Sequence, residues 1–446
     1  MKLTADQKEQ LSRPRPFLFL IVLGMFALPW VILLRSGVQA RQQQRQMNVE
    51  AKHFFAQFSS VERNESAQRF DRLGADLGFN PSDPGDLLFR TNSEAELAYQ
   101  AVDKSLSRFL AAQTTKIAGP LAALPPELRA YLDTYAESLT AAQSHILESD
   151  LPRWNLDLER MQNPGYPFPG FVNVRDVQRL LLLSVIDNSQ RGQQPEMLGA
   201  LEASWRLNQA VLQRPDLVSQ ILTSGVSEQQ AGLLRHVENV PTVWQTRLIQ
   251  QAQQQSVLAG RQFDVWLQYS ISQRSLDVTL YRSDANSAIG DWLASALSYG
   301  FSPVYMLQLR AIDTTQTANR ALEQLHHLEA CSTGQLSAER ALAAETTARW
   351  NRATALEPSV VAKRWKVAGD RQLTLELTQQ VLQAKQRFHQ VQRWPEPLPR
   401  IASQFCHGEY WVYERGDDNT ITMSLSAERR LDSLGPFRYQ FPSSYR

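Results

Sequence analysis

The spacing of apolar positions predicts a chain built mainly from helices. Apolar residues recur every three or four positions over residues 95–109, 177–185 and 198–205, which places them on one face of a helix. A longer stripe predicts a helix over residues 370–392; its members are Leu373, Leu377, Val381, Ala384, Phe388 and Val391. No fixed repeat period is present, so we expect an irregular α-helical bundle or solenoid-like body.

Local signals predict where several of these helices begin. Ser93 with Glu96 resembles a capping box, in which the two side chains satisfy the first free N–H groups of a helix. Ser227 with Gln230 has the same spacing and predicts another helix start. Pro215 is expected to open a segment between these two.

Turn-forming residues divide the chain into regions. Residues 163–170 contain three prolines and two glycines, a composition that interrupts regular structure. We therefore predict a linker over residues 163–172, between an N-terminal helical region (35–162) and the main helical body (173–394).

The last part of the chain, residues 395–446, changes to a strand pattern. Residues 409–414 are aromatic and β-branched, residues 416–419 supply turn chemistry, and apolar and polar residues alternate over 421–425. This pattern predicts a β-hairpin, and residues 437–441 are candidates for a third strand. An isolated hairpin is marginally stable in water, so we expect this module to pack on helices.

The most specific pattern is an uncharged run from Pro16 to Leu34. Its 19 residues cover close to the roughly 30 Å hydrocarbon thickness of a bilayer when helical. Trp30 is placed as an interfacial anchor. The run therefore predicts a transmembrane helix that contacts the lipid bilayer over residues 16–34, after a cytoplasmic tail (1–15).

A cleaved signal peptide is the alternative, because small residues precede a cleavage position after Ala40. The apolar run is longer than the usual core of a signal peptide, which favours the anchor. Basic residues are slightly more numerous before the run than after it, which predicts a cytoplasmic N-terminus. The expected location is the inner (cytoplasmic) membrane of a bacterium, in a single pass, with most of the chain in the periplasm.

The net charge is close to zero, but the charged residues are distributed unevenly along the chain. The formal net charge is +1, from 46 basic and 45 acidic residues. Residues 1–45 carry a formal +5 and the rest of the chain −4, so the positive charge brackets the predicted membrane segment. A mildly acidic body does not favour nucleic acid as a partner. Lysine contributes only 8 of the basic residues, and the rest are arginines.

Two cysteines, Cys331 and Cys406, offer candidate chemistry. In an exported domain such a pair predicts one disulfide, which would tie the β module to the helical body. The less favoured alternatives are two free thiols and a zinc site that adds His327 and His407. The zinc alternative has poor spacing, because adjacent cysteine and histidine do not easily bind one metal.

Sequence motifs assign no further site. The chain has no nucleophile elbow, zinc-protease motif, phosphate-binding loop or dinucleotide fingerprint. We therefore name no catalytic, cofactor-binding or metal-binding residue, and expect no cofactor. Tryptophans at helical spacing, such as Trp205 and Trp266, are expected in the core rather than at a ligand.

Residues 174–225 consist of a leucine-rich helix, a short glycine turn, an amphipathic helix and a helix opened by proline. This stretch is similar to uncharacterised, membrane-anchored α-helical envelope proteins of Gram-negative bacteria. The resemblance implies an envelope location and an all-helical body, and it carries no activity.

Three functions remain open from the sequence. The favoured one is a non-enzymatic scaffold or adaptor of the cell envelope, whose helical surfaces contact other envelope proteins. The second is a periplasmic ligand-binding or sensing domain, with a groove that uses the aromatic residues of segment 266–305; the ligand is unknown. The third is a hydrolase whose site has no recognisable motif.

Overall fold

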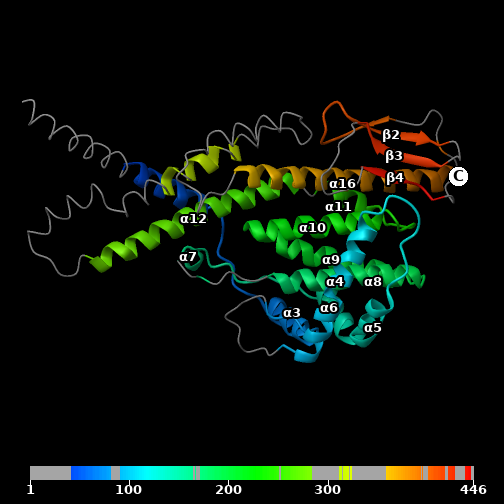
Figure 1. Cartoon of the computed structure of the whole chain (residues 1–446), viewed down its shortest axis with the longest axis horizontal. Coiled ribbons are helices and arrows are strands. Elements are labelled where there is room, and N and C mark those ends of the chain that lie inside the picture. Colours follow the sequence, from blue (N-terminus) through cyan, green and yellow to red (C-terminus); the bar gives the residue numbers. More distant parts are fainter. Residues whose placement is uncertain are drawn as a thin grey trace, which may run out of the picture. The chain divides into compact units, whose positions relative to one another are not determined.

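The computed structural model of the chain describes residues 42–81, 91–163, 166, 171–250, 253–283, 311–313, 315–320, 322–323, 358–392, 394, 400–416, 420–426 and 437–442. Over these residues the protein is mainly helical, with one small antiparallel sheet near the C-terminus (Figure 1). The predicted mainly helical fold with a C-terminal β module is thus confirmed. The predicted membrane helix over residues 16–34, including Trp30, lies outside the described residues; within them, no helix has the length and apolarity needed to span a bilayer.

The chain divides into two compact units, residues 1–57 with 268–316, and residues 58–267 with 317–446. In the first unit, a helix over residues 42–55 contacts the later part of helix α12 (Gln253–Ser283). The Tyr269 hydroxyl donates to Asn48 Oδ1 at 2.9 Å, and the Gln44 amide donates to Gln273 Oε1 at 2.8 Å. Polar side chains therefore join the helix over residues 42–55 to α12.

The second unit contains most of the described helices. In chain order they are α3 (Glu65–Asp76), α4 (Ser93–Thr114), α5 (Pro126–Thr134), α6 (Ala136–Glu148), α7 (Leu158–Met161), α8 (Val172–Gln190), α9 (Gln194–Leu212), α10 (Leu217–Leu234), α11 (Val243–Ile249) and α16 (Pro358–Val391), together with residues 253–267 of α12.

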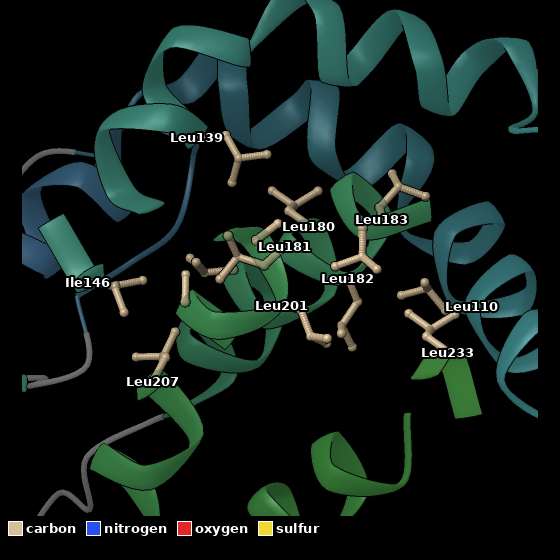
Figure 2. Close-up of a cluster of buried hydrophobic side chains, with 14 of the residues drawn as sticks. Leu110, Leu139, Ile146, Leu180, Leu181, Leu182, Leu183, Leu201, Leu207 and Leu233 are labelled. Carbon is tan, nitrogen blue, oxygen red and sulfur yellow. The ribbon is translucent and has the colours of Figure 1, made fainter. Parts of the chain in front are cut away.

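Helix α8 lies at the centre of the apolar core. The four consecutive side chains of Leu180–Leu183 are fully buried, so α8 is surrounded rather than exposed on one side. Figure 2 shows these leucines among apolar side chains from α4, α6, α9 and α10. One apolar cluster contains residues on both sides of the predicted 163–172 linker, from Ala67 to Leu248, and adds Leu375 and Leu382 of α16.

Helix α4 begins at Ser93 as predicted, but its predicted cap is wrong, and so is the helix start predicted at Ser227. Helix α4 is capped by Asn92, whose side-chain oxygen accepts from the backbone N–H groups of Glu94 and Ala95; the predicted capping box of Ser93 and Glu96 is one residue out. Ser227 lies inside the continuous helix α10, where its buried hydroxyl donates to the Thr223 carbonyl at 2.9 Å. A serine that bonds back to its own helix needs no helix end.

Helices α4 and α10 cross closely at Gly232. A Cβ atom at this position would lie 2.3 Å from the carbonyl oxygen of Thr114. Only glycine allows the two backbones to approach to this distance. The crossing brings the C-terminal ends of both helices together.

The C-terminal sheet has the order β1-β2-β3-β4, all antiparallel: β1 (Arg400–Ala402), β2 (Tyr410–Arg415), β3 (Ile421–Leu425) and β4 (Arg438–Gln440). Strands β2 and β3 form the predicted hairpin, with Trp411 opposite Leu425 and Tyr413 opposite Met423. Strand β4 lies where the third strand was expected, and β1 was not predicted. The sheet packs on α16 (Figure 1).

Candidate functional site: a cationic junction beneath the C-terminal sheet

The C-terminal end of α10 places an arginine in the protein interior. Arg235 follows the last residue of α10 and is 6% exposed. Its Nη2 atom donates to the carbonyl oxygen of Thr114, the last residue of α4, at 2.9 Å. The last carbonyls of a helix lack partners within the helix and carry partial negative charge. The guanidinium therefore closes the end of α4.

Lys385 of α16 meets the end of α10 in the same way. Its Nζ atom donates to the carbonyl oxygens of Arg235 at 2.7 Å and Val237 at 3.1 Å, and the side chain is buried. The Tyr439 hydroxyl of β4 donates to the same Arg235 carbonyl at 2.8 Å, and the Tyr439 ring lies 5.7 Å from Nζ. One carbonyl at the end of α10 thus accepts from both α16 and the sheet.

His236 joins the loop between α4 and α5 to this group. Its Nδ1 lies 3.0 Å from the carbonyl oxygen of Gly119, and its Nε2 lies 3.1 Å from that of Lys116. A neutral imidazole has a single N–H, so it donates to one of these carbonyls at a time, whereas the protonated ring donates to both. The ring also contacts Tyr439 edge to face, with centroids 5.7 Å apart.

We call Arg235, His236, Lys385 and Tyr439 the cationic junction. Burial lowers the pKa of Arg235 to about 10, and Tyr439 and then Glu228 oppose this change. Burial lowers the pKa of Lys385 to about 8, and Glu238 opposes this change. Burial, and after it the charge of Arg235, lowers the pKa of His236 to about 4.

Clustered groups with altered pKa values mark candidate functional sites, although structural ion networks produce them too. In the cationic junction the acceptors are backbone carbonyls of α4, of the α4–α5 loop and of the residues that end α10. A lysine engaged by two carbonyls is oriented to hold chain segments rather than to attack a substrate. The geometry therefore supports an assembling role.

Glu376 of α16 makes a second connection to the sheet. Its carboxylate accepts from the Ser403 hydroxyl at 2.7 Å and from the Gln404 backbone N–H at 2.5 Å. Ser403 Oγ in turn accepts from the backbone N–H of Cys406 at 3.0 Å. Burial raises the pKa of Glu376, and these two hydrogen bonds oppose the rise. The loop after β1 is thereby fixed to α16.

Cys406 is fully buried in this loop and is disulfide-bonded. The other cysteine of the sequence, Cys331, lies outside the described residues, so its pairing stays a prediction. A disulfide sulfur is not the thiolate that zinc requires. His327 also lies outside the described residues, and the part of the chain that is described contains no group of three or more metal-ligating side chains.

A serine and a histidine that the sequence did not connect meet between α3 and α6. His145 Nε2 lies 3.1 Å from Ser66 Oγ and 2.9 Å from the Ser66 carbonyl oxygen. Ser66 Oγ donates to the Asp150 carbonyl at 2.6 Å, so it accepts from Nε2–H. The Ser149 hydroxyl then donates to Nδ1 at 2.9 Å. To act as a general base toward Ser66, His145 would need an unprotonated Nε2 facing Ser66 Oγ. In this arrangement Nε2 carries the proton, so His145 is not placed to take the serine proton.

The aromatic segment that the sequence suggested for ligand binding is described only in part. Trp266 is 5% exposed and belongs to the interior, and residues 284–305 lie outside the described residues. Trp205 stacks on the guanidinium of Arg247, whose carbon lies 3.8 Å from the ring centroid. Arg247 also pairs with Glu202 at 2.5 Å. This pair joins α9 to α11.

Sequence reasoning missed the cationic junction because its members are far apart in the chain. The adjacent basic residues Arg235 and His236 directly follow a leucine pair that ends a helix. Basic residues at a helix C-terminus can bind its last carbonyls, and this placement is the one local signal of the junction. Lys385 lies beside the predicted apolar stripe of α16, and its position does not indicate its partner. A comparison of the chain with protein-family models, curated proteins and solved structures gave no match.

Proposed function

We propose that the protein is a membrane-anchored scaffold or adaptor of the bacterial cell envelope that acts through protein–protein contacts. The observation that carries this proposal is the cationic junction, in which the buried Arg235 and Lys385 and the half-buried His236 bind backbone carbonyls from three parts of the chain. Such contacts hold a surface in shape, and a scaffold presents a shaped surface.

The predicted anchor and the charge distribution support the location. Basic residues bracket the apolar run 16–34, and the rest of the chain is mildly acidic. A basic flank favours anionic lipid head groups. In this proposal residues 16–34 cross the inner membrane once and the helical body faces the periplasm, as the resemblance of residues 174–225 also implies.

Site-specific crosslinking in cells tests the scaffold function. A photoreactive residue at Leu97 or Val218, whose side chains are 67% and 66% exposed, should give adducts of defined mass with a companion protein. The control replaces Leu183, which is fully buried, and should give none. A single protein species after mild detergent extraction, without adducts at either exposed position, would contradict the proposal.

A further inference from the structure

The guanidinium group of Arg247 contacts two indole rings and a carboxylate. Its central carbon lies 3.8 Å from the centroid of the Trp205 ring of α9 and 4.9 Å from that of the Trp244 ring of α11. Glu202 of α9 accepts two hydrogen bonds from the same group, from Nη1 at 2.5 Å and from Nη2 at 3.0 Å. Aromatic faces together with a carboxylate that accepts twice are the groups that recognise a planar organic cation.

Helical spacing places the three groups that surround this guanidinium. Glu202 and Trp205 are three residues apart in α9, so their side chains project from one face of that helix. Trp244 lies on α11, three residues before Arg247. The carboxylate and one ring therefore come from α9, and the second ring comes from α11. Their positions follow from the helices that carry them.

Both rings have packing contacts that do not involve Arg247. Trp244 is 3% exposed and belongs to the large apolar cluster around α8, and the Trp205 ring packs against the same cluster. The indole N–H of Trp205 is buried and has no acceptor among the described residues, so packing rather than a hydrogen bond orients this ring. Side chains that are held by packing keep a binding site in shape.

The same group is open to solvent on one side. The side chains of Glu202 and Arg247 are 33% and 17% exposed. Shortening Arg247 therefore gives a small soluble ion access to the carboxylate in the folded protein. A guanidinium ion is planar and weakly hydrated, whereas an ammonium ion is a strongly hydrated point charge. The arrangement of rings and carboxylate therefore favours a guanidinium ion.

We infer that Glu202, Trp205 and Trp244 form a preorganised binding site for a guanidinium group, and that the chain fills this site with its own Arg247. We call these three residues the guanidinium site. The alternative is an ordinary stacked ion pair, in which the rings take their places only around the Arg247 side chain. Only a preorganised site binds a free guanidinium ion after Arg247 has been shortened. The inference does not depend on the proposed scaffold function.

The variant Arg247→Ala vacates the guanidinium site and tests the inference in the full chain, extracted in mild detergent. Ethylguanidinium carries the atoms that this substitution removes, so it should raise the urea midpoint of the variant in a saturable manner. At about ten times its dissociation constant it should lower the unfolding equilibrium constant about tenfold. Tetramethylammonium cannot donate hydrogen bonds to Glu202 and should act more weakly, and sodium chloride at the same ionic strength should not act. Equal effects of the three salts would overturn the inference.

Arg371→Ala is the matched control. Arg371 is 20% exposed and pairs with Glu228 at 2.9 Å, but its guanidinium contacts that carboxylate and the Ser224 hydroxyl rather than aromatic rings. Ethylguanidinium should leave the urea midpoint of this variant unchanged.

Removal of the carboxylate tests the site directly. Adding Glu202→Gln to the Arg247→Ala protein should weaken the binding of ethylguanidinium about tenfold. If Arg247→Ala does not fold alone, its refolding yield with and without ethylguanidinium is the readout. Recovery of both arginine variants by ethylguanidinium, or of neither, would overturn the inference.

Discussion

At the residue scale, cationic side chains that bind backbone carbonyls recur through the second unit. Arg206 donates to the carbonyls of Leu147 at 2.7 Å and Ser149 at 2.9 Å, at the end of α6. Arg235 and Lys385 do the same at the ends of α4 and α10. A planar guanidinium presents several N–H groups at fixed angles. Binding of backbone carbonyls by guanidinium groups gives a physical reason why arginine far outnumbers lysine in this protein.

The half-buried His236 predicts a loss of stability in acid. Its pKa in the fold, about 4, is below the ordinary 6.5, so between these values the unfolded chain binds more protons than the folded one. The free energy of unfolding should then fall as the pH decreases from 6.5 toward 4, by up to about 1.4 kcal/mol per pH unit. Urea unfolding of the wild type and of His236→Gln at pH 6.5 and pH 5 measures this component.

The contribution of His236 is isolated as the difference between the two proteins. Glu376 acts in the opposite direction, because its raised pKa makes stability fall as the pH rises above the ordinary 4.5. His389→Gln serves as the control, since this side chain is exposed on α16. If His236→Gln loses as much stability in acid as the wild type, the imidazole of His236 is not the cause.

At the element scale, helix α10 carries two glycines in different surroundings. A Cβ atom at Gly225 would meet its nearest neighbour, the Arg371 guanidinium, at 3.6 Å, which is ordinary contact. At Gly232 it would meet the backbone of α4 at 2.3 Å. The same substitution should therefore have opposite effects seven residues apart.

Gly225→Ala should stabilise the protein by up to about 1 kcal/mol, because alanine is the better helix former. Gly232→Ala should destabilise it by about 1–3 kcal/mol, because α4 and α10 have to move apart. Denaturant unfolding of the two variants beside the wild type measures both effects. A Gly232→Ala protein as stable as the wild type would show that the crossing is looser than described.

Helices with regular apolar spacing could be predicted from the sequence, because their apolar stripe is the face that becomes buried. Helix α16 is an example. Five of the six residues in its predicted stripe are buried in one cluster, while Val391 at the helix end is 57% exposed. Helix starts were harder to predict, because Asn92, Ser93 and Ser227 are all plausible capping residues. Only the backbone geometry decides which side chain reaches a free N–H.

The cationic junction could not be predicted for a different reason. Thr114, Arg235, Lys385 and Tyr439 come from α4, α10, α16 and β4, and their meeting depends on the packing of all four elements. No local pattern specifies which carbonyl a buried cation will bind. The short strand β1 was missed likewise, because its three residues acquire strand geometry by pairing with β2.

At the scale of the whole molecule, the predicted anchor determines the side of the membrane on which the body lies. A reporter fused after Arg446 should be active only on the periplasmic side, because the N-terminal tail carries more basic residues than the opposite flank. Replacing the basic residues of the tail by glutamine should weaken this orientation and move part of the reporter to the cytoplasm; these residues are Lys2, Lys8, Arg13 and Arg15. A cytoplasmic reporter on the unaltered chain would contradict the predicted topology.

The close crossing at Gly232 has a consequence for tracing the ancestry of this chain. Leucines of the core tolerate exchange for other apolar residues of similar volume, so a diverged relative keeps little of their identity. The crossing admits no side chain, and the basic residue three positions later closes the facing helix. A lone glycine followed at that spacing by arginine, at the end of an apolar helix, is the mark by which we expect distant relatives to be recognised.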